Sequence, residues 1–215
     1  MSSDESAARP RRRRNPRGEG ARLRDELVEA ASDLIAEHGS AEGVSIRAVA
    51  RRAGVSAPSV YLHFDDRDAL ISAVLVQRFA DLGDAVVEGI EAAGGDASPF
   101  SRLVAGCHAY IAYGLGNPGH YRVLFGTPVG PFSPTMSSAA AESLNLLVEG
   151  IARCEEAGAA IAGTPLDVAT IVWSSLHGQV MLRVVSPSFP WPPVDAMLLP
   201  LLRGLVRMPD VTAGG

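Results

Sequence analysis

Residues 44–64, with the sequence VSIRAVARRAGVSAPSVYLHF, predict two short helices joined by a sharp turn. Ser45 is placed to cap the first helix, because its hydroxyl can accept a hydrogen bond from a backbone N–H in the first turn. Gly54 readily adopts the positive φ that ends a helix and turns the chain. The apolar residues of the first helix recur at i, i+3, i+4 and i+7, so one face is expected to be buried: Ile46, Val49, Ala50 and Ala53.

The second short helix leaves small side chains on its outer face. Ser56 is a candidate N-cap, and Pro58 fits the first helical turn, where the missing N–H needs no partner. Three apolar side chains can anchor this helix in a core: Val55, Val60 and Phe64. Three residues are left on the opposite side: Ala57, Ser59 and Tyr61. Small residues permit close approach to base edges, and a helix N-terminus attracts phosphate, so the pattern predicts a helix-turn-helix for DNA.

This stretch, with the acidic pair, Arg67 and Leu70 that follow it, resembles the DNA-binding domain of the TetR/AcrR (tetracycline-repressor-like) transcriptional regulators. The resemblance runs from about Arg22 to Leu75. It implies a three-helix DNA-binding domain that leads into a long fourth helix, whose first turn carries a basic residue that contacts phosphate. Arg67 stands at that position, where lysine is more usual.

The resemblance also implies capping hydroxyls at Ser45 and Ser56, and phosphate-contacting groups at Tyr61 and His63. Two alternatives remain open: the two serines can act as caps alone, and His63 can simply pack beneath the domain. The complete set of predicted DNA-binding residues is Arg22, Ser45, Arg47, Ser56, Ala57, Pro58, Ser59, Tyr61, His63 and Arg67.

The distribution of charge reconciles DNA binding with an acidic chain. The 215 residues carry a formal net charge of −5, yet residues 1–24 contain eight arginines against three acidic residues. From Asp68 onward there are 7 arginines and 13 acidic residues. The basic arm, residues 1–20, is predicted to be disordered on its own and to lie in the minor groove beside the helix-turn-helix. The alternative is a solvated tail that attracts DNA only nonspecifically.

The rest of the chain predicts an all-α protein of about nine helices. Apolar residues at helical spacing indicate helices at 21–38, 68–93, 99–115, 118–125, 137–157, 165–185 and 195–207. Prolines mark loops around 128–134 and 187–193, and Pro200 predicts that the last helix is kinked or starts later. We expect a helix-turn-helix domain at 21–66, a helical ligand-binding and dimerisation domain at 67–208, and a flexible C-terminus at 209–215.

Several functional classes find no support in the sequence. Residues 114–119, GLGNPG, match the dinucleotide fingerprint only formally, because a helical pattern precedes them where a strand is required. The histidines are scattered, and Cys107 and Cys154 are expected to be reduced core residues, so no enzyme, cofactor or metal site is predicted. Polar residues interrupt the most apolar stretch, 168–185, and no apolar segment follows the N-terminal arginines, which predicts a cytoplasmic protein without a membrane span.

The C-terminal half resembles a TetR subfamily whose C-terminal domain is named for its Trp-His-Gly residues. The resemblance rests on residues 117–125, NPGHYRVLF, and on Trp173 with the run from Leu176 to Gly178. It implies a small-molecule pocket within helices four to seven and a four-helix bundle that helices eight and nine form with a second copy. The predicted ligand-binding residues are Tyr110, Tyr121, Phe125, Trp173, His177 and Met181. The alternative is that these side chains are only core.

Together these patterns predict a homodimeric transcriptional regulator. We expect a repressor that binds a palindromic double-stranded DNA operator and is released by a small apolar ligand. Two alternatives are a DNA-binding regulator without small-molecule control, and an all-α enzyme or carrier that uses the C-terminal cavity.

Overall fold

The structure is a computed structural model, and it describes residues 19–126 and 134–209. Within these ranges it contains nine helices and two short strands: α1 (Glu19–His38), α2 (Ile46–Arg52), α3 (Ala57–Val60), α4 (Arg67–Ala92), α5 (Pro99–Gly116), α6 (Pro118–Gly126), α7 (Pro134–Glu156), β1 (Ala160–Ile161), α8 (Pro165–Val185), α9 (Val194–Leu205) and β2 (Val206–Arg207). The all-α fold class is therefore confirmed. The predictions for residues 1–18 of the basic arm, for Pro128 and Pro131, and for the C-terminus after residue 209 lie outside the described residues. The predicted arm extends to residue 20, but α1 already begins at Glu19.

α7 begins at Pro134, three residues before its predicted start and at a proline expected to lie in a loop, whereas the last helix lies within two residues of its predicted limits. α9 begins at Val194, ends at Leu205 and passes through Pro200 without starting later. Leu198 and Leu202 flank this proline and are fully buried, so packing holds the helix together although the ring removes one backbone donor. β1 and β2, which the sequence did not predict, form an antiparallel pair with Ala160 opposite Arg207. Two residues are too few to show strand periodicity.

Local signals explain the first three helices. The Ser45 hydroxyl accepts a hydrogen bond from the Ala48 N–H at 3.2 Å, which confirms it as the cap of α2. Gly54 has φ of +69°, as the turn requires. Ser56 occupies the N-cap position of α3 but makes no capping bond; its Oγ lies 2.8 Å from Ser59 Oγ. The expected side-chain cap at Ser56 is therefore wrong, because the two hydroxyls bond to each other.

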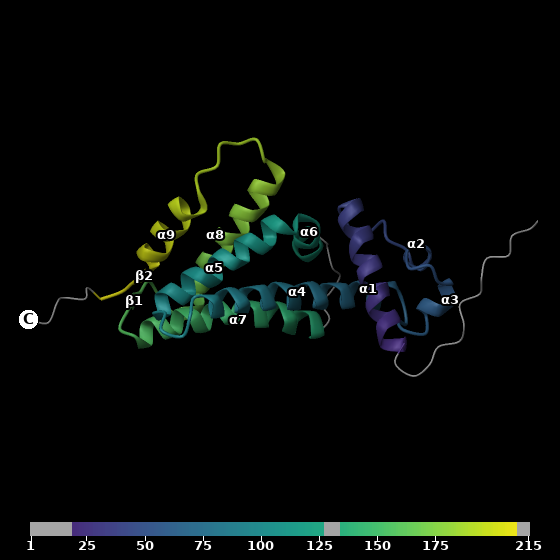
Figure 1. The fold of residues 1–215 in the computed structure, drawn as a ribbon, viewed down its shortest axis with the longest axis horizontal. Coiled ribbons are helices and arrows are strands. Elements are labelled where there is room, and N and C mark those ends of the chain that lie inside the picture. The colour runs from purple at the N-terminus through teal and green to yellow at the C-terminus, as the bar shows by residue number, and fades with distance from the viewer. Residues whose placement is uncertain (1–18, 127–133, 210–215) are drawn as a thin grey trace, which may run out of the picture.

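α4 belongs to two hydrophobic cores. Its first turns, up to Leu75, pack with α1, α2 and α3, whereas Phe79 and Leu82 belong to the core of the larger domain. Figure 1 shows α1, α2 and α3 at one end of the molecule and α4 extending from them beside α7. Apolar contacts thus change from one domain to the other inside α4, between residues 75 and 79, and the predicted boundary at residue 66 marks only where the helix begins.

α8 is unusual in the number of large apolar side chains that it exposes: Leu166, Ile171, Trp173, Leu182 and Val185. It is also the one helix of the described residues that is long and apolar enough to cross a membrane, with 33% of the relevant window buried. Core helices pass the same test of length and composition, and α8 packs against α5, α7 and α9. By helical spacing, Ile171, Leu182 and Val185 share one side of α8, whereas Leu166 and Trp173 lie on another side.

Candidate DNA-binding surface and internal cavity

The helix-turn-helix presents an exposed outer surface at the end of the molecule. Of the predicted DNA-binding residues, six are exposed: Arg22, Ser45, Arg47, Ser56, Pro58 and Tyr61. Four are half-buried: Ala57, Ser59, His63 and Arg67. Tyr61 has 56% of its surface exposed although it is aromatic, whereas Val60 beside it is fully buried. The turn therefore orients a phenol outward while its neighbour anchors the helix.

Arg67 lies in the first turn of α4, but its donors already have partners in the protein. Its Nε donates to the Val44 carbonyl at 2.8 Å, and Nη2 donates to the Ala41 carbonyl. Nη1 lies 3.0 Å from Asp68 Oδ1. The guanidinium thus ties α4 to the loop before α2. The phosphate contact that the resemblance implies for Arg67 stays a prediction.

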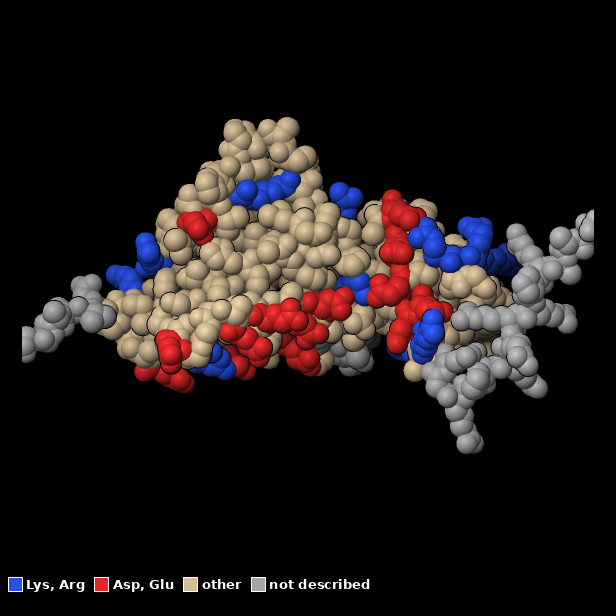
Figure 2. All heavy atoms as spheres, viewed as in Figure 1, with Lys and Arg blue, Asp and Glu red and all other residues tan. Residues whose placement is uncertain are grey.

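Arg52 was not among the predicted site residues, yet it fixes the position of α2. Its Nη2 donates to Glu37 Oε2 at 2.6 Å, and Nη1 lies 3.7 Å from Asp33 Oδ2, both on α1. The hydrogen bond from Arg52 lowers the pKa of Glu37 below its ordinary value. Figure 2 shows acidic side chains in a line across α1, and Glu29, Asp33 and Glu37 recur there at every fourth residue.

A buried arginine joins three helices where the two domains meet. Arg78 of α4 has 4% of its side chain exposed, and it contacts Glu29 of α1, Asp81 at 3.2 Å and His120 of α6 at 3.2 Å. Burial and then the Arg78 charge lower the pKa of His120. α6 also lies close to α1, since a Cβ on Gly119 would come within 2.8 Å of Ala36 Cβ. A displacement of α6 would therefore reach α1 directly.

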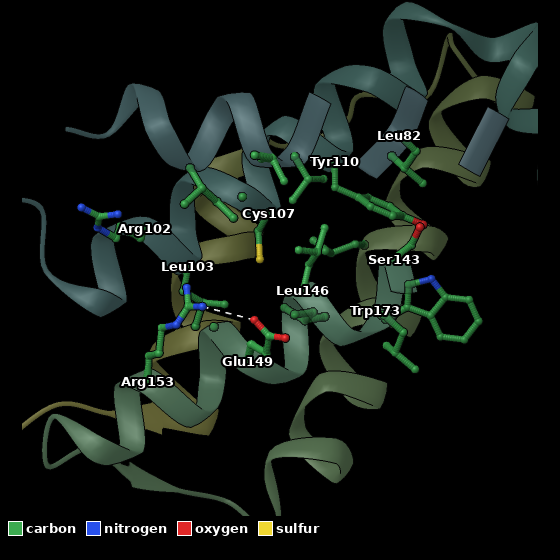
Figure 3. Close-up of a pocket in the computed structure, with 18 of the residues that line it drawn as sticks. Leu82, Arg102, Leu103, Cys107, Tyr110, Ser143, Leu146, Glu149, Arg153 and Trp173 are labelled. Atoms are coloured by element: carbon green, nitrogen blue, oxygen red, sulfur yellow. Dashed lines mark hydrogen bonds and ion pairs between the residues drawn. The ribbon is translucent and has the colours of Figure 1, made fainter. Parts of the chain in front are cut away.

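The larger domain contains a cavity of about 1190 Å³ among α4, α5, α6, α7 and α8. Figure 3 shows Leu82, Leu103, Cys107 and Leu146 pointing into it. Three of the predicted ligand-binding residues line the cavity: Tyr110, Phe125 and Trp173. The α4 and α7 residues of its wall were missed, because an apolar stripe on a helix has the same spacing whether it faces a core or a cavity.

The other three predicted ligand-binding residues lie outside the cavity lining. Met181 packs against the core, and Tyr121 and His177 stand behind Tyr110. The Tyr110 hydroxyl lies 2.8 Å from that of Tyr121, which in turn lies 2.9 Å from His177 Nδ1. Their rings, with Phe125 and Trp173, form one aromatic cluster whose neighbouring centroids are 4.6–6.4 Å apart. Sequence reasoning therefore found the cluster but not which of its faces meets the cavity.

Burial sets the protonation of the groups around the cavity. It raises the pKa of Tyr110 to about 12 and lowers the pKa of His177, so both side chains are neutral near pH 7. Burial likewise raises the pKa of the Cys107 thiol to about 12. Cys107 and Cys154 are free and buried, and the protonated thiols are poor nucleophiles.

Comparisons with known proteins agree with these features. Residues 27–74 match the family described as bacterial regulatory proteins, tetR family, and residues 103–205 match the tetracyclin repressor-like C-terminal domain. An HTH-type transcriptional regulator of Mycobacterium bovis is 32% identical over 103 residues, which are 48% of this chain and 43% of that protein. The matched segment thus spans less than half the length of this curated relative.

Solved structures share the fold over most of the chain. A protein of unknown function from Rhodococcus sp. RHA1 has a TM-score of 0.74 and 26% identity, and the match covers 86% of this chain and 96% of that one. A TetR family transcription regulator from Marinobacter aquaeolei has a TM-score of 0.69 and 19% identity, with 89% and 99% covered. With both of its domains matched, the chain belongs to the TetR family of bacterial regulatory proteins.

Proposed function

We propose that the protein is a cytoplasmic transcriptional repressor that binds a palindromic double-stranded DNA operator as a homodimer and leaves it when a small molecule occupies the cavity. The observation that carries this proposal is the continuous α4, whose first half packs in the helix-turn-helix domain and whose second half lines the cavity. It acts by binding rather than by catalysis. Because α4 belongs to both sites, a ligand that moves α4 at the cavity also changes the DNA-binding domain. Such a coupling is required if ligand binding is to lower the affinity for DNA.

The DNA surface is assigned to α2, α3 and the basic arm. Exposed Arg47 and Tyr61 flank the turn, and residues 1–24 supply eight arginines against three acidic residues. Affinity for a duplex comes largely from neutralised phosphates, so this uneven charge lets an acidic chain bind DNA. The acidic side chains along α1 repel phosphate (Figure 2), so the duplex is expected to lie against α2 and α3 and not against α1.

DNA binding is tested with the full chain and the DNA upstream of its own gene. Fluorescence anisotropy should show tighter binding to this fragment than to an unrelated fragment of equal length, with affinity that falls as salt rises. Tyr61→Ala should weaken specific binding roughly fivefold, the effect of one lost hydrogen bond. Phe189→Ala is the matched control, since Phe189 is 54% exposed but lies on the loop between α8 and α9. Equal binding to both fragments would refute the proposal.

Dimerisation is assigned to α8 and α9. The monomer leaves large apolar side chains of α8 exposed, with Leu182 55% exposed and Val185 67% exposed. A two-fold copy would cover this face and give two recognition helices for the two halves of a palindrome.

A further inference from the structure

We infer that the cavity binds an uncharged, mainly apolar ligand and holds one hydroxyl or carbonyl oxygen of that ligand with the Tyr110 hydroxyl. This inference rests on the proposed ligand-controlled function and specifies the chemistry of its ligand. It excludes anionic ligands such as a fatty carboxylate, although a long apolar chain would fit the cavity by shape alone.

The cavity walls call for an apolar body. The described residues that line the cavity are mostly aliphatic and aromatic, and the cavity of about 1190 Å³ exceeds the roughly 300–1,000 Å³ typical of ligand sites. Val86 and Ile90 of α4 line it together with Leu144 and Leu147 of α7. A ligand of ten or more carbon atoms can therefore be buried without polar groups along its length.

The cations of the cavity lining are already engaged. Arg102 donates from Nε to the Ala97 carbonyl at 3.2 Å, and from Nη2 to the Gly94 and Gly95 carbonyls at 2.9 and 2.7 Å. Arg153 donates to Glu149 Oε2 at 3.2 Å (Figure 3). These two are the arginines among the described lining residues, and no lysine occurs in the chain.

The remaining charged lining residues repel an anion. Glu91, Glu149 and Glu156 line the cavity together with the two arginines, so its charged groups sum to −1. Arg153 and Glu149 are 61% and 60% exposed, so this pair lies at the rim of the cavity. A ligand carboxylate held at the buried Tyr110 hydroxyl would lie away from both arginines (Figure 3) and would have no cation as its partner. Burying a charge that lacks a partner is costly, so an uncharged ligand is favoured.

Tyr110 supplies the polar contact. Its hydroxyl bonds to Tyr121, which bonds to His177. A hydroxyl has one donor and two acceptor positions, so the bond to Tyr121 leaves others open. If Tyr110 donates to Tyr121, it can still accept from a ligand hydroxyl; if it accepts from Tyr121, it can donate to a ligand carbonyl. Tyr121 and His177 are positioning residues that hold this hydroxyl in place.

The inference is tested by calorimetric titration of the full chain with 1-decanol and with decanoate at pH 8. These probes share their chain length and differ in charge. We expect a Kd for 1-decanol at least about tenfold below that for decanoate, which corresponds to 1.4 kcal/mol or more. Tyr110→Phe should raise the Kd for 1-decanol roughly 2- to 12-fold, the effect of one hydrogen bond.

Tyr113→Phe is the matched control. Tyr113 lies on the same helix and is outside the cavity lining, so its loss should leave the Kd for 1-decanol within about twofold, below the range of one hydrogen bond. Decanoate binding as tightly as 1-decanol would overturn the inference, as would an unchanged Kd in Tyr110→Phe or no binding of 1-decanol.

Operator binding is measured on the same preparations, so the two failures can be told apart. Intact DNA binding without any 1-decanol affinity refutes the ligand class alone. Tight 1-decanol binding that leaves DNA affinity unchanged supports the ligand class and refutes ligand-controlled release.

Discussion

The Arg67 guanidinium donates to the Val44 carbonyl at 2.8 Å and so joins the first turn of α4 to the residue that precedes the α2 cap. Through this contact any rotation of α4 is transmitted to the start of α2. The same side chain bonds to the Ala41 carbonyl, and these two acceptors lie 23 and 26 residues before it in the chain. Arg67 therefore acts as a tie between the linking helix and the DNA-binding helices.

Replacing Arg67 with lysine should expose this role. One ammonium cannot reproduce the fixed fork of the guanidinium, so Arg67→Lys should lower the free energy of unfolding by about 1 kcal/mol, measured by urea denaturation. The slope of log affinity for DNA against log salt should stay unchanged, because the charge is kept. Arg67→Met distinguishes the roles further: a slope reduced by about one would show that Arg67 instead contacts a phosphate.

Gly114 should be intolerant of a side chain. A Cβ at this position would lie 2.6 Å from Val180 Cγ1 and 3.0 Å from the Tyr121 ring, both of them buried. We expect Gly114→Ala to lower the free energy of unfolding by about 1–3 kcal/mol, the usual cost of overpacking. Gly116→Ala is the matched control, since nothing lies within 4 Å of its Cβ position. Equal stability of the two variants, measured by thermal unfolding, would contradict the packing role.

Stability should fall as the pH drops below about 6.5. Burial lowers the pKa of both His120 and His177 in the folded protein, so protons bind more readily to the unfolded chain. The stabilisation is fully present above the ordinary histidine pKa of 6.5 and is lost as the pH falls toward the lowered folded values. Glu29, Asp81 and Asp33 act against this shift at His120.

Chemical denaturation between pH 7.5 and 5 measures this effect. His120→Asn should reduce the dependence of the unfolding free energy on pH, and the double variant with His177→Asn should reduce it further. An unchanged dependence in the double variant would assign the titration to other groups.

The exposed face of α8 should be needed for dimerisation. A carboxylate at Leu182 would be buried without a partner in a two-fold bundle, so Leu182→Asp should convert the dimer to a monomer. Light scattering after size-exclusion chromatography measures the mass directly. Leu115→Asp is the control, because this leucine is 37% exposed on α5. A wild-type protein that is already monomeric would remove the basis for two-site operator binding.

The sequence predicted α8 at its observed limits and placed α1, α4, α5 and α6 within about two residues. It also predicted the Ser45 cap and the Gly54 turn. These features depend on a few neighbouring residues, because caps and apolar spacing act within one or two turns. The β1–β2 pair escaped prediction because its partners are distant in sequence and too short for a periodic pattern.

The sequence by itself determined the helices, the helix-turn-helix and the family, since these lie in local order and spacing. Only the tertiary structure decided which polar groups have partners: the donors of Arg67 and Arg102 are taken by carbonyls, and Arg78 is buried among three helices. It also decided that Tyr110 lines the cavity while Tyr121 stands behind it. The physical reason is that hydrogen bonds and cavity walls join residues far apart in the chain, where spacing carries no information.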